Sequence, residues 1–124
     1  MTVAPNIAIK RVYDPPAAGD GLRILVDRLW PRGLARAKAG IDLWLKDIAP
    51  STELRLDFGH DPVRWPAFVA AYRKELATNP EPLDRLLGLC NARSITLLFA
   101  AHDIVHNNAV VLADVLTEHR RKGS

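Results

Sequence analysis

The feature that most constrains this chain is Ser94–Ala100, a run of β-prone and almost wholly apolar residues. A stretch with helical spacing follows it after a short polar link, so strand, loop and helix come in that order. Leu22–Val26 has the same apolar character, which is typical of a strand covered on both faces. Ile7–Tyr13 reads as a third strand, which Pro15 ends. Strands that alternate with helices predict an α/β domain with a mostly parallel sheet.

The remaining segments predict several helices and one extended stretch. Ser51 is a candidate N-cap for a short helix to about Phe58, and Asp61 followed by Pro62 is a second start signal. Pro66 is expected to bend the first turn of the helix that follows. Ile41–Ile48 is ambiguous, and we favour an extended segment. The apolar positions at helical spacing are Trp65, Phe68, Val69, Tyr72 and Leu76, then Leu83, Leu86, Leu87 and Cys90, and finally Val105, Ala109, Leu112, Ala113 and Leu116.

The length of 124 residues and the 48% hydrophobic content predict one small domain. We expect three layers, with a sheet of about three to four strands and helices on both faces, a core over residues 7–117 and a basic C-terminal tail over 118–124. A single cysteine, Cys90, excludes an intrachain disulfide framework and a Cys-rich zinc site. It lies on an apolar helical stripe, which predicts a buried thiol. No apolar run reaches membrane-spanning length and no signal peptide is visible, so a cytoplasmic protein is expected.

The net charge of +3 resides at the C-terminal end of the sequence. Arg120, Arg121 and Lys122 account for all of it, which leaves the body of the chain neutral. Such a cluster is typical of a solvated helix end that complements the helix dipole. A neutral body lacks the basic face of a dedicated nucleic-acid binder, so nucleic acid is the less favoured ligand.

Two loops are the best places for chemistry, because ligands of parallel α/β sheets bind beyond the carboxyl ends of the strands. One loop follows the strand at 22–26 and carries Asp27, Arg28, Trp30 and Arg32. The other follows the strand at 94–100. If the two strands are parallel, both loops lie at one edge. The planar guanidinium groups suit a carboxylate or a phosphate, and Asp27 could orient one of them or act as a base. The alternative is an internal Asp–Arg ion pair that fixes the loop, with Trp30 as a packing residue.

Further residues could complete such a site. Arg55 could be a third cationic contact, or it could pair with Asp57, Asp61 or Glu75. Glu75 could be a general base or a structural partner of Arg55, and Tyr72 could simply pack.

Two His-Asp dipeptides, His60-Asp61 and His102-Asp103, raise the question of a metal site. Metallohydrolases built on such dipeptides are all-helical, whereas this chain has convincing strands, so we expect no metal. Asp103 is equally well explained as the N-cap of the last helix. His106 and His119 are expected to be exposed. The sequence has no nucleophile elbow, phosphate-binding loop or dinucleotide fingerprint, and it leaves the cofactor unknown.

The motifs, taken in order, closely resemble the YeaO-like branch of the domain of unknown function 488 (DUF488) family. The most specific run is Val26-Asp-Arg-Leu-Trp-Pro-Arg-Gly33, and the resemblance covers about residues 7–117. Its other matching stretches are Lys10-Arg-Val-Tyr-Asp-Pro15, Asp42-x-Trp-x-Lys46, Ala49-Pro-Ser-Thr-Glu-Leu-Arg55, Phe58, Tyr72-x-x-Glu-Leu76, Thr96-Leu-Leu98 and Asn107-x-Ala-x-Val-Leu112.

The resemblance implies a small cytosolic α/β protein, and a site made of the family motif residues. Wider relatives carry Cys or Glu after the last strand where this chain has Phe99 and Ala101, which argues against thiol chemistry. Relatives in this branch often have Lys at the position of His102. The implied site residues are Asp27, Arg28, Trp30, Arg32, Lys46, Ser51, Arg55, Tyr72, Glu75 and Asn107.

The sequence therefore favours an enzyme that acts on a small phosphate- or carboxylate-bearing substrate. In this hypothesis Asp27, Arg28, Arg32 and Glu75 are catalytic. The other implied residues, Trp30, Lys46, Ser51, Arg55, Tyr72 and Asn107, bind the substrate. The alternatives are a non-catalytic module for a small ligand or nucleic acid, and a structural polar network in a protein that acts through a partner. The sequence does not fix the oligomeric state.

Overall fold

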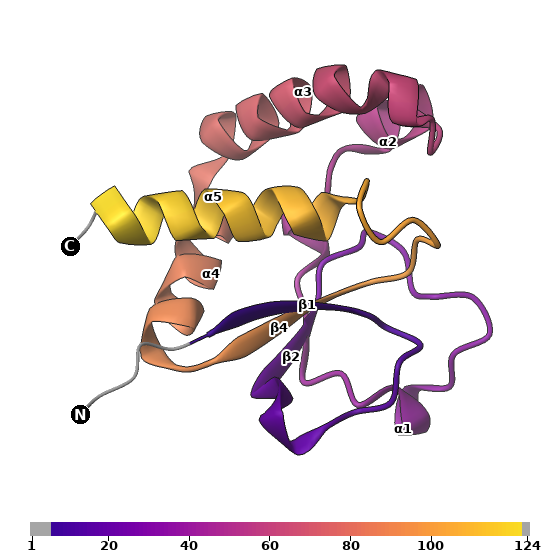
Figure 1. The fold of residues 1–124 in the computed structure, drawn as a ribbon, viewed down its shortest axis with the longest axis vertical. Coiled ribbons are helices and arrows are strands. Elements are labelled where there is room, and N and C mark those ends of the chain that lie inside the picture. Colours follow the sequence, from indigo (N-terminus) through magenta and orange to yellow (C-terminus); the bar gives the residue numbers. More distant parts are fainter. Residues whose placement is uncertain (1–5, 123–124) are drawn as a thin grey trace.

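The structure, a computed structural model, describes residues 6–122 and is built on one four-stranded parallel sheet (Figure 1). The strand order is β1-β4-β2-β3, so the two most apolar strands are neighbours at the centre. The strands are β1 (Ile7–Arg11), β2 (Leu22–Leu25), β3 (Leu43–Trp44) and β4 (Ile95–Phe99). The helices are α1 (Arg36–Ala39), α2 (Thr52–Phe58), α3 (Trp65–Thr78), α4 (Pro80–Ala92) and α5 (Asn108–Lys122). The α/β class and the parallel sheet are confirmed.

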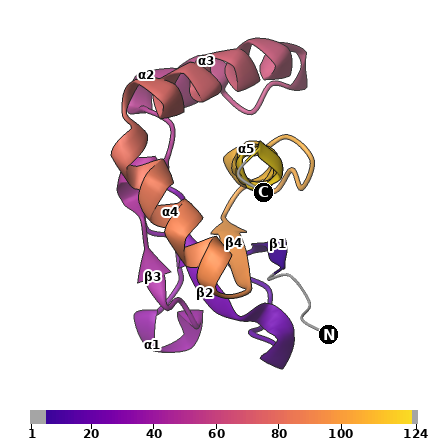
Figure 2. The same ribbon diagram turned by 90° about the vertical axis from the view of Figure 1, so that its left-hand side faces the viewer.

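The two faces of the sheet are covered unequally (Figure 2). Alternate residues of a strand point to opposite faces, so Ile95, Leu97 and Phe99 of β4 face the larger core together with side chains from α2, α3, α4 and α5. Leu98 points to the other face. There it packs with Leu25 and Val12, and Trp30 and Trp44 pack against these three residues. Cys90 is fully buried in the larger core, as predicted.

Local signals explain where the helices begin. Ser51 caps α2, since its Oγ accepts the N–H of Leu54 at 3.1 Å. Asp61 caps a 3-10 turn over Pro62–Arg64 that leads into α3. Pro66 lies in the first turn of α3, where a missing N–H costs no helical hydrogen bond, so no bend is needed there.

A glycine allows β2 to enter the sheet beside β4. Gly21 has a φ of +64°, and a Cβ at this position would lie 2.3 Å from the carbonyl oxygen of Ser94. That carbonyl accepts the N–H of Leu22 at 3.0 Å, which starts the pairing of the two strands.

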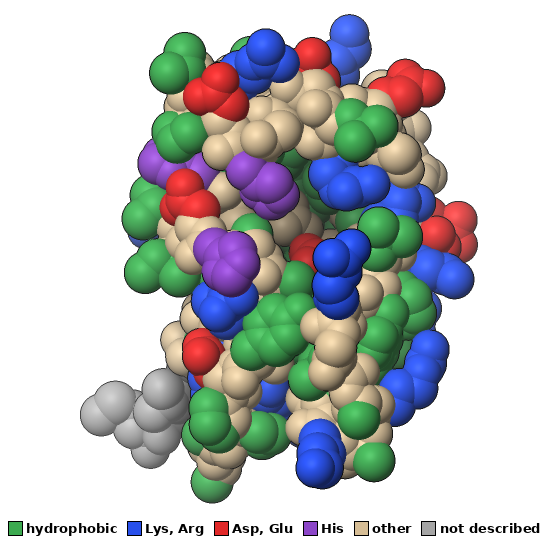
Figure 3. All heavy atoms as spheres, turned by 90° about the vertical axis from the view of Figure 1, so that its right-hand side faces the viewer, with side chains coloured by type: hydrophobic (Ala, Val, Ile, Leu, Met, Phe, Trp, Pro, Cys, Tyr) green, Lys and Arg blue, Asp and Glu red, His purple; other side chains and the backbone are tan. Residues whose placement is uncertain are grey.

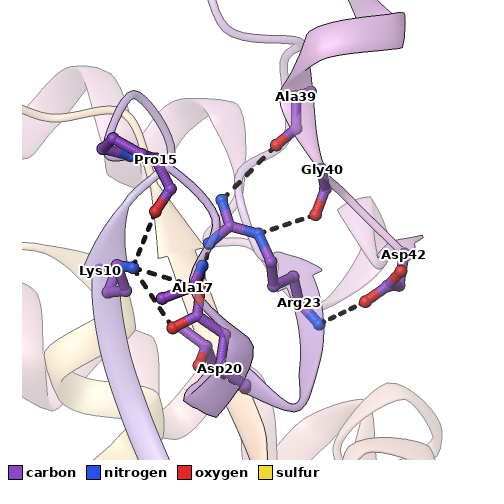
Figure 4. A network of polar contacts seen from close by, with 9 residues as sticks. Lys10, Pro15, Ala17, Asp20, Arg23, Ala39, Gly40 and Asp42 are labelled. Carbon is purple, nitrogen blue, oxygen red and sulfur yellow. Dashed lines mark hydrogen bonds and ion pairs between the residues drawn. The ribbon is translucent and has the colours of Figure 1, made fainter.

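A buried ionic network closes the end of the sheet at which β2 starts (Figure 4). The Asp20 carboxylate accepts hydrogen bonds from the guanidinium of Arg23, the ammonium of Lys10 and the N–H of Ala17. Arg23 also donates from Nε to the carbonyl of Gly40 at 2.7 Å, which ties the end of α1 to β2. The N–H of Ala17, followed by Arg23 and Lys10, lowers the pKa of Asp20 to about 2 from 3.8, although burial opposes the shift.

None of the helices within residues 6–122 combines the length and the apolar character that crossing a membrane requires.

We predict that Asp20→Asn destabilises the fold in a pH-dependent way. A carboxyl whose pKa is depressed in the folded state stabilises above its unfolded pKa, and this stabilisation is lost as the pH falls through the folded value. The melting temperature of the variant should therefore lie below that of the wild type at pH 7. The gap should shrink as the pH falls from about 5 to about 2. Thermal melts by circular dichroism measure both, and a gap that is independent of pH would contradict the ionic role of Asp20.

Candidate functional site

The parallel pairing of β2 with β4 brings the two predicted loops together. The register joins Leu22 to Ile95 and Leu25 to Leu98, so the chain leaves both strands at the same edge. The carboxylate of Asp27 accepts the N–H of Ala100 at 2.9 Å, which links the two loops directly.

A cavity of about 580 Å³ lies between these loops and the end of α2. Figure 3 looks onto this edge and shows a hollow, with histidine side chains on one side and Lys or Arg side chains on the other. A volume of this size suits a small organic ligand. The predicted site residues that line it are Asp27, Arg28, Trp30, Arg32, Arg55 and Asn107.

Asp27 is a partly buried acid of this cavity. Burial away from water raises its pKa above the ordinary value of 3.8. The N–H of Ala100, the side chain of Asn108 and the charges of Arg55 and His60 oppose that rise. No ion pair joins Asp27 to an arginine within residues 6–122, so the alternative of an Asp–Arg pair that fixes the loop is wrong. The backbone hydrogen bond to Ala100 fixes it instead.

Arg28 lines the cavity but is engaged by the backbone. It donates from Nε to the carbonyl of Pro50 at 3.2 Å and from Nη2 to that of Ala49 at 3.1 Å. The guanidinium therefore holds the segment before α2 against the loop that follows β2.

Trp30 and Lys46 belong to the covering of the second sheet face. Trp30 donates from Nε1 to the carbonyl of Leu34 at 2.7 Å and packs edge-to-face with Trp44, with 5.5 Å between ring centroids. Arg36 lies over the Trp30 ring, and the Lys46 ammonium lies 5.2 Å from the Trp44 centroid. Trp30 still borders the cavity, whereas Lys46 does not line it.

Arg32 and Arg55 are exposed cations of the cavity that have no opposite charge bound to them. Neither guanidinium makes a hydrogen bond or an ion pair with any residue between 6 and 122. The alternative partners of Arg55 are otherwise engaged, because Arg64 lies within 4 Å of the carboxylates of Asp57 and Asp61. These two arginines are therefore available to a ligand.

Glu75, Ser51 and Tyr72 lie outside this cavity, around a second one of about 250 Å³. Glu75 accepts the N–H and the hydroxyl of Ser51 at 2.9 and 2.6 Å, which secures the start of α2. The fully buried Tyr72 donates its hydroxyl to the carbonyl of Ile48 at 2.7 Å, and burial raises its pKa well above 10.0. All three side chains thus hold α2 and α3 in place.

Asn107, and not Asp103, caps the last helix. The Asn107 Oδ1 accepts the N–H of Val110 at 3.1 Å, and its Nδ2 donates to the carbonyl of Asp103. The expectation that Asp103 caps this helix is wrong, since α5 begins only at Asn108.

Asp103 instead closes a turn of its own and orients His106. One carboxylate oxygen accepts the N–H groups of Val105 and His106 at 2.9 Å, and the other lies 2.8 Å from Nδ1 of His106. These contacts, with the N–H of His106 first, lower the pKa of Asp103 to about 2. This pair was missed at the sequence level, although the Asp-x-x-His spacing directly after a strand was a usable signal.

Histidines gather at the cavity. His60, His102 and His106 line it, and only His119 of the four histidines does not. His106 was expected to be exposed, but its side chain is 29% exposed and its ring centroid lies 5.2 Å from that of Trp65. His60 is the non-glycine residue with a positive φ, +57°, in the described part of the chain. Within residues 6–122, no three His, Cys, Asp or Glu side chains are grouped so that they could hold a metal ion.

We predict that Tyr72→Phe lowers stability and leaves ligand binding at the cavity unchanged. The substitution removes one buried hydroxyl and leaves the Ile48 carbonyl without its donor, which costs about 1–3 kcal/mol. Urea denaturation measures the loss. A variant as stable as the wild type would contradict the structural role of this hydroxyl.

The comparisons with known proteins agree with the family resemblance. The model described as "Inactive DUF488-N3 subclade" matches residues 6–124. Uncharacterized protein YeaO of Escherichia coli (strain K12) is 46% identical over 111 residues, which cover 90% of this chain and 96% of that protein. Uncharacterized protein Rv3073c of Mycobacterium tuberculosis (strain ATCC 25618 / H37Rv) is 36% identical over 116 residues, 94% of this chain and 98% of the relative. No solved structure matches the chain significantly.

Proposed function

The chain belongs to the DUF488 family, in the subclade described as inactive DUF488-N3, and from this premise we propose that its cavity binds a small organic anion without converting it. The observation that carries the proposal is the pair of unengaged guanidinium groups of Arg32 and Arg55 at a cavity of about 580 Å³. Guanidinium groups bind carboxylates and phosphates through paired hydrogen bonds that are stronger than neutral ones.

The residues expected to be catalytic make hydrogen bonds within the protein, and this favours a binding protein over an enzyme. Arg28 is held by two backbone carbonyls and Glu75 by Ser51. Asp27 is tied to the backbone of Ala100. Arg28 and Glu75 would have to break these contacts in order to reach a substrate. Asp27 keeps its contact with Ala100 and still has free lone pairs on its carboxylate.

The carboxylate of Asp27 restricts which chemical groups a ligand of this cavity can carry. A carboxylate has about four lone-pair positions, and the hydrogen bond from the N–H of Ala100 uses one of them. The remaining capacity can accept a hydrogen bond from a ligand but repels a bare anion. The favoured ligand therefore carries an anionic group for the arginines and a hydrogen-bond donor for Asp27.

Nucleic acid gains no support from the distribution of charge. The basic residues of α5 lie in its last turn, at the opposite end of the helix from Asn108, which lines the cavity (Figure 1). They do not line the site that contains Arg32 and Arg55.

An enzymatic role is the second candidate, and one observation favours it. Asp103 orients the imidazole of His106 at the same cavity, an arrangement that suits a general base. Incubation with a panel of phosphate and carboxylate esters tests this role. Product that forms with the wild type but not with His106→Asn would replace the binding proposal with catalysis.

We predict that Arg32→Ala weakens phosphate binding by about tenfold or more, because a charge-assisted hydrogen bond contributes about 1.5–3 kcal/mol. Arg85→Ala, which removes an exposed arginine from α4, is the matched control and should bind like the wild type. Isothermal titration calorimetry with inorganic phosphate gives both affinities. Equal binding by the two variants, or no phosphate binding by the wild type, would refute an anion site at Arg32.

We predict that the wild type binds phosphate more tightly than sulfate at pH 8, and that Asp27→Asn reduces this preference. Hydrogen phosphate has an O–H group to donate to the Asp27 carboxylate, whereas sulfate has none and meets only a like charge. The amide of Asn can donate to either anion. Titrations of both proteins with both anions measure the preference, and a ratio unchanged by the substitution would remove Asp27 from ligand recognition.

A further inference from the structure

The exposed large hydrophobic side chains of residues 6–122 belong to the chain segments that form the cavity, and two of them, Tyr13 and Leu29, line it. Each of them either lines the cavity or lies within three residues of a side chain that does. Figure 3 shows hydrophobic side chains on this face beside and below the hollow. We call this set the apolar rim; its members are Tyr13, Leu29, Leu56, Val63, Ile104 and Val105.

The concentration of these residues in the segments that form the cavity favours a ligand larger than a free anion. The outer surfaces of α3, α4 and α5 carry no exposed large hydrophobic residue within 6–122, so the rest of the fold keeps such side chains covered. Leu29 and Ile104 are 60% and 67% exposed. Apolar residues clustered around a polar pocket are typical of a surface that binds another macromolecule. A small anion would leave the apolar rim in water.

The charges of Arg32, Arg55 and Asp27 in the cavity indicate which part of a macromolecule could bind there. The C-terminal residue of a polypeptide carries a carboxylate, and its own backbone N–H lies beside that group. Arg32 and Arg55 can hold the carboxylate, and Asp27 can accept the N–H. An internal segment of a chain has no backbone carboxylate, so this pair of contacts suits a chain end better than a segment that passes through.

We infer that the anion bound by the cavity is the C-terminal carboxylate of a partner polypeptide whose last residues are apolar, and that the apolar rim holds those side chains. The inference rests on the proposed function, because it identifies the anion of that site. It follows a recognised mode of peptide recognition, in which a terminal carboxylate is captured and neighbouring pockets read the side chains. The basic end of α5, with Arg120 and Lys122, has the same sign of charge as the cavity, which disfavours insertion of that end from a second copy.

The test uses an array of synthetic pentapeptides with free C-termini, in which the last three positions are varied over all residue types. The same array with amidated C-termini removes the charge. Binding is measured for the wild type, for Arg32→Ala, and for a double variant, Ile104→Ser with Val105→Ser. The matched control is Ala77→Ser, at an exposed position of α3. Phosphate titration of every protein reports the anion site independently, since Ile104 and Val105 do not line the cavity.

The expected result is binding of free-acid peptides with apolar last residues, lost on amidation and with Arg32→Ala. The double rim variant should weaken peptide binding about tenfold while phosphate binding is unchanged. Ala77→Ser should behave as the wild type.

Three outcomes overturn the inference. If phosphate binds but no peptide does, or if amidation has no effect, the anion site stands and its occupant is not a chain terminus. If neither phosphate nor peptide binds, the proposed function fails as well. If light scattering shows a dimer that the rim variant dissociates, a second copy covers the rim.

Discussion

The parallel pairing of β2 with β4 is the contact on which the rest of the site depends. These two strands are far apart in the sequence but hydrogen-bonded in the sheet, so the loops that follow them leave the same edge. Asp27 then bridges to Ala100, and the side chain of Asn108 donates to the carbonyl of Val26 at 2.9 Å. Each bond crosses from one loop to the other. The walls of the cavity are thereby fixed relative to each other before any ligand binds.

The polar residues around this edge divide into those that hold the scaffold and those that face solvent. Arg28 braces the segment before α2, and the contact between Glu75 and Ser51 secures the start of that helix. Because these groups fix the backbone from which Arg55 projects, the free cation is supported by residues that need not touch a ligand. Arg32 is placed in a similar way, since the hydroxyl of Tyr13 donates to its carbonyl oxygen at 2.9 Å.

The sequence was sufficient for β1, β2 and β4 and for the meeting of the two loops, because apolar runs and helical spacing are local patterns. It was not sufficient for Ile41–Ile48, where the expected extended segment is a strand only at Leu43–Trp44 and a 3-10 turn follows. It was not sufficient to separate ligand contacts from scaffold. Glu75 and Tyr72 form hydrogen bonds with residues 24 positions away in the sequence, and the spacing of neighbouring residues does not predict such partners. The helix α5 begins later than the sequence predicted, for a different reason. Asp103 and Asn107 are both good N-cap residues, and Asp103 is used up in orienting His106.

The arrangement of charge in the cavity explains how a buried acid can coexist with an anion site. Burying Asp27 is costly, and its raised pKa reflects that cost, but the N–H of Ala100 satisfies part of the carboxylate without a ligand. The positive groups lie towards solvent on separate segments. A ligand with an anionic group and an adjacent donor matches both signs at once, whereas a symmetric anion gains from the arginines and loses to the acid. If the cavity has the function that we propose, it selects ligands by the placement of their charges, and because its walls are already fixed, little ordering opposes binding.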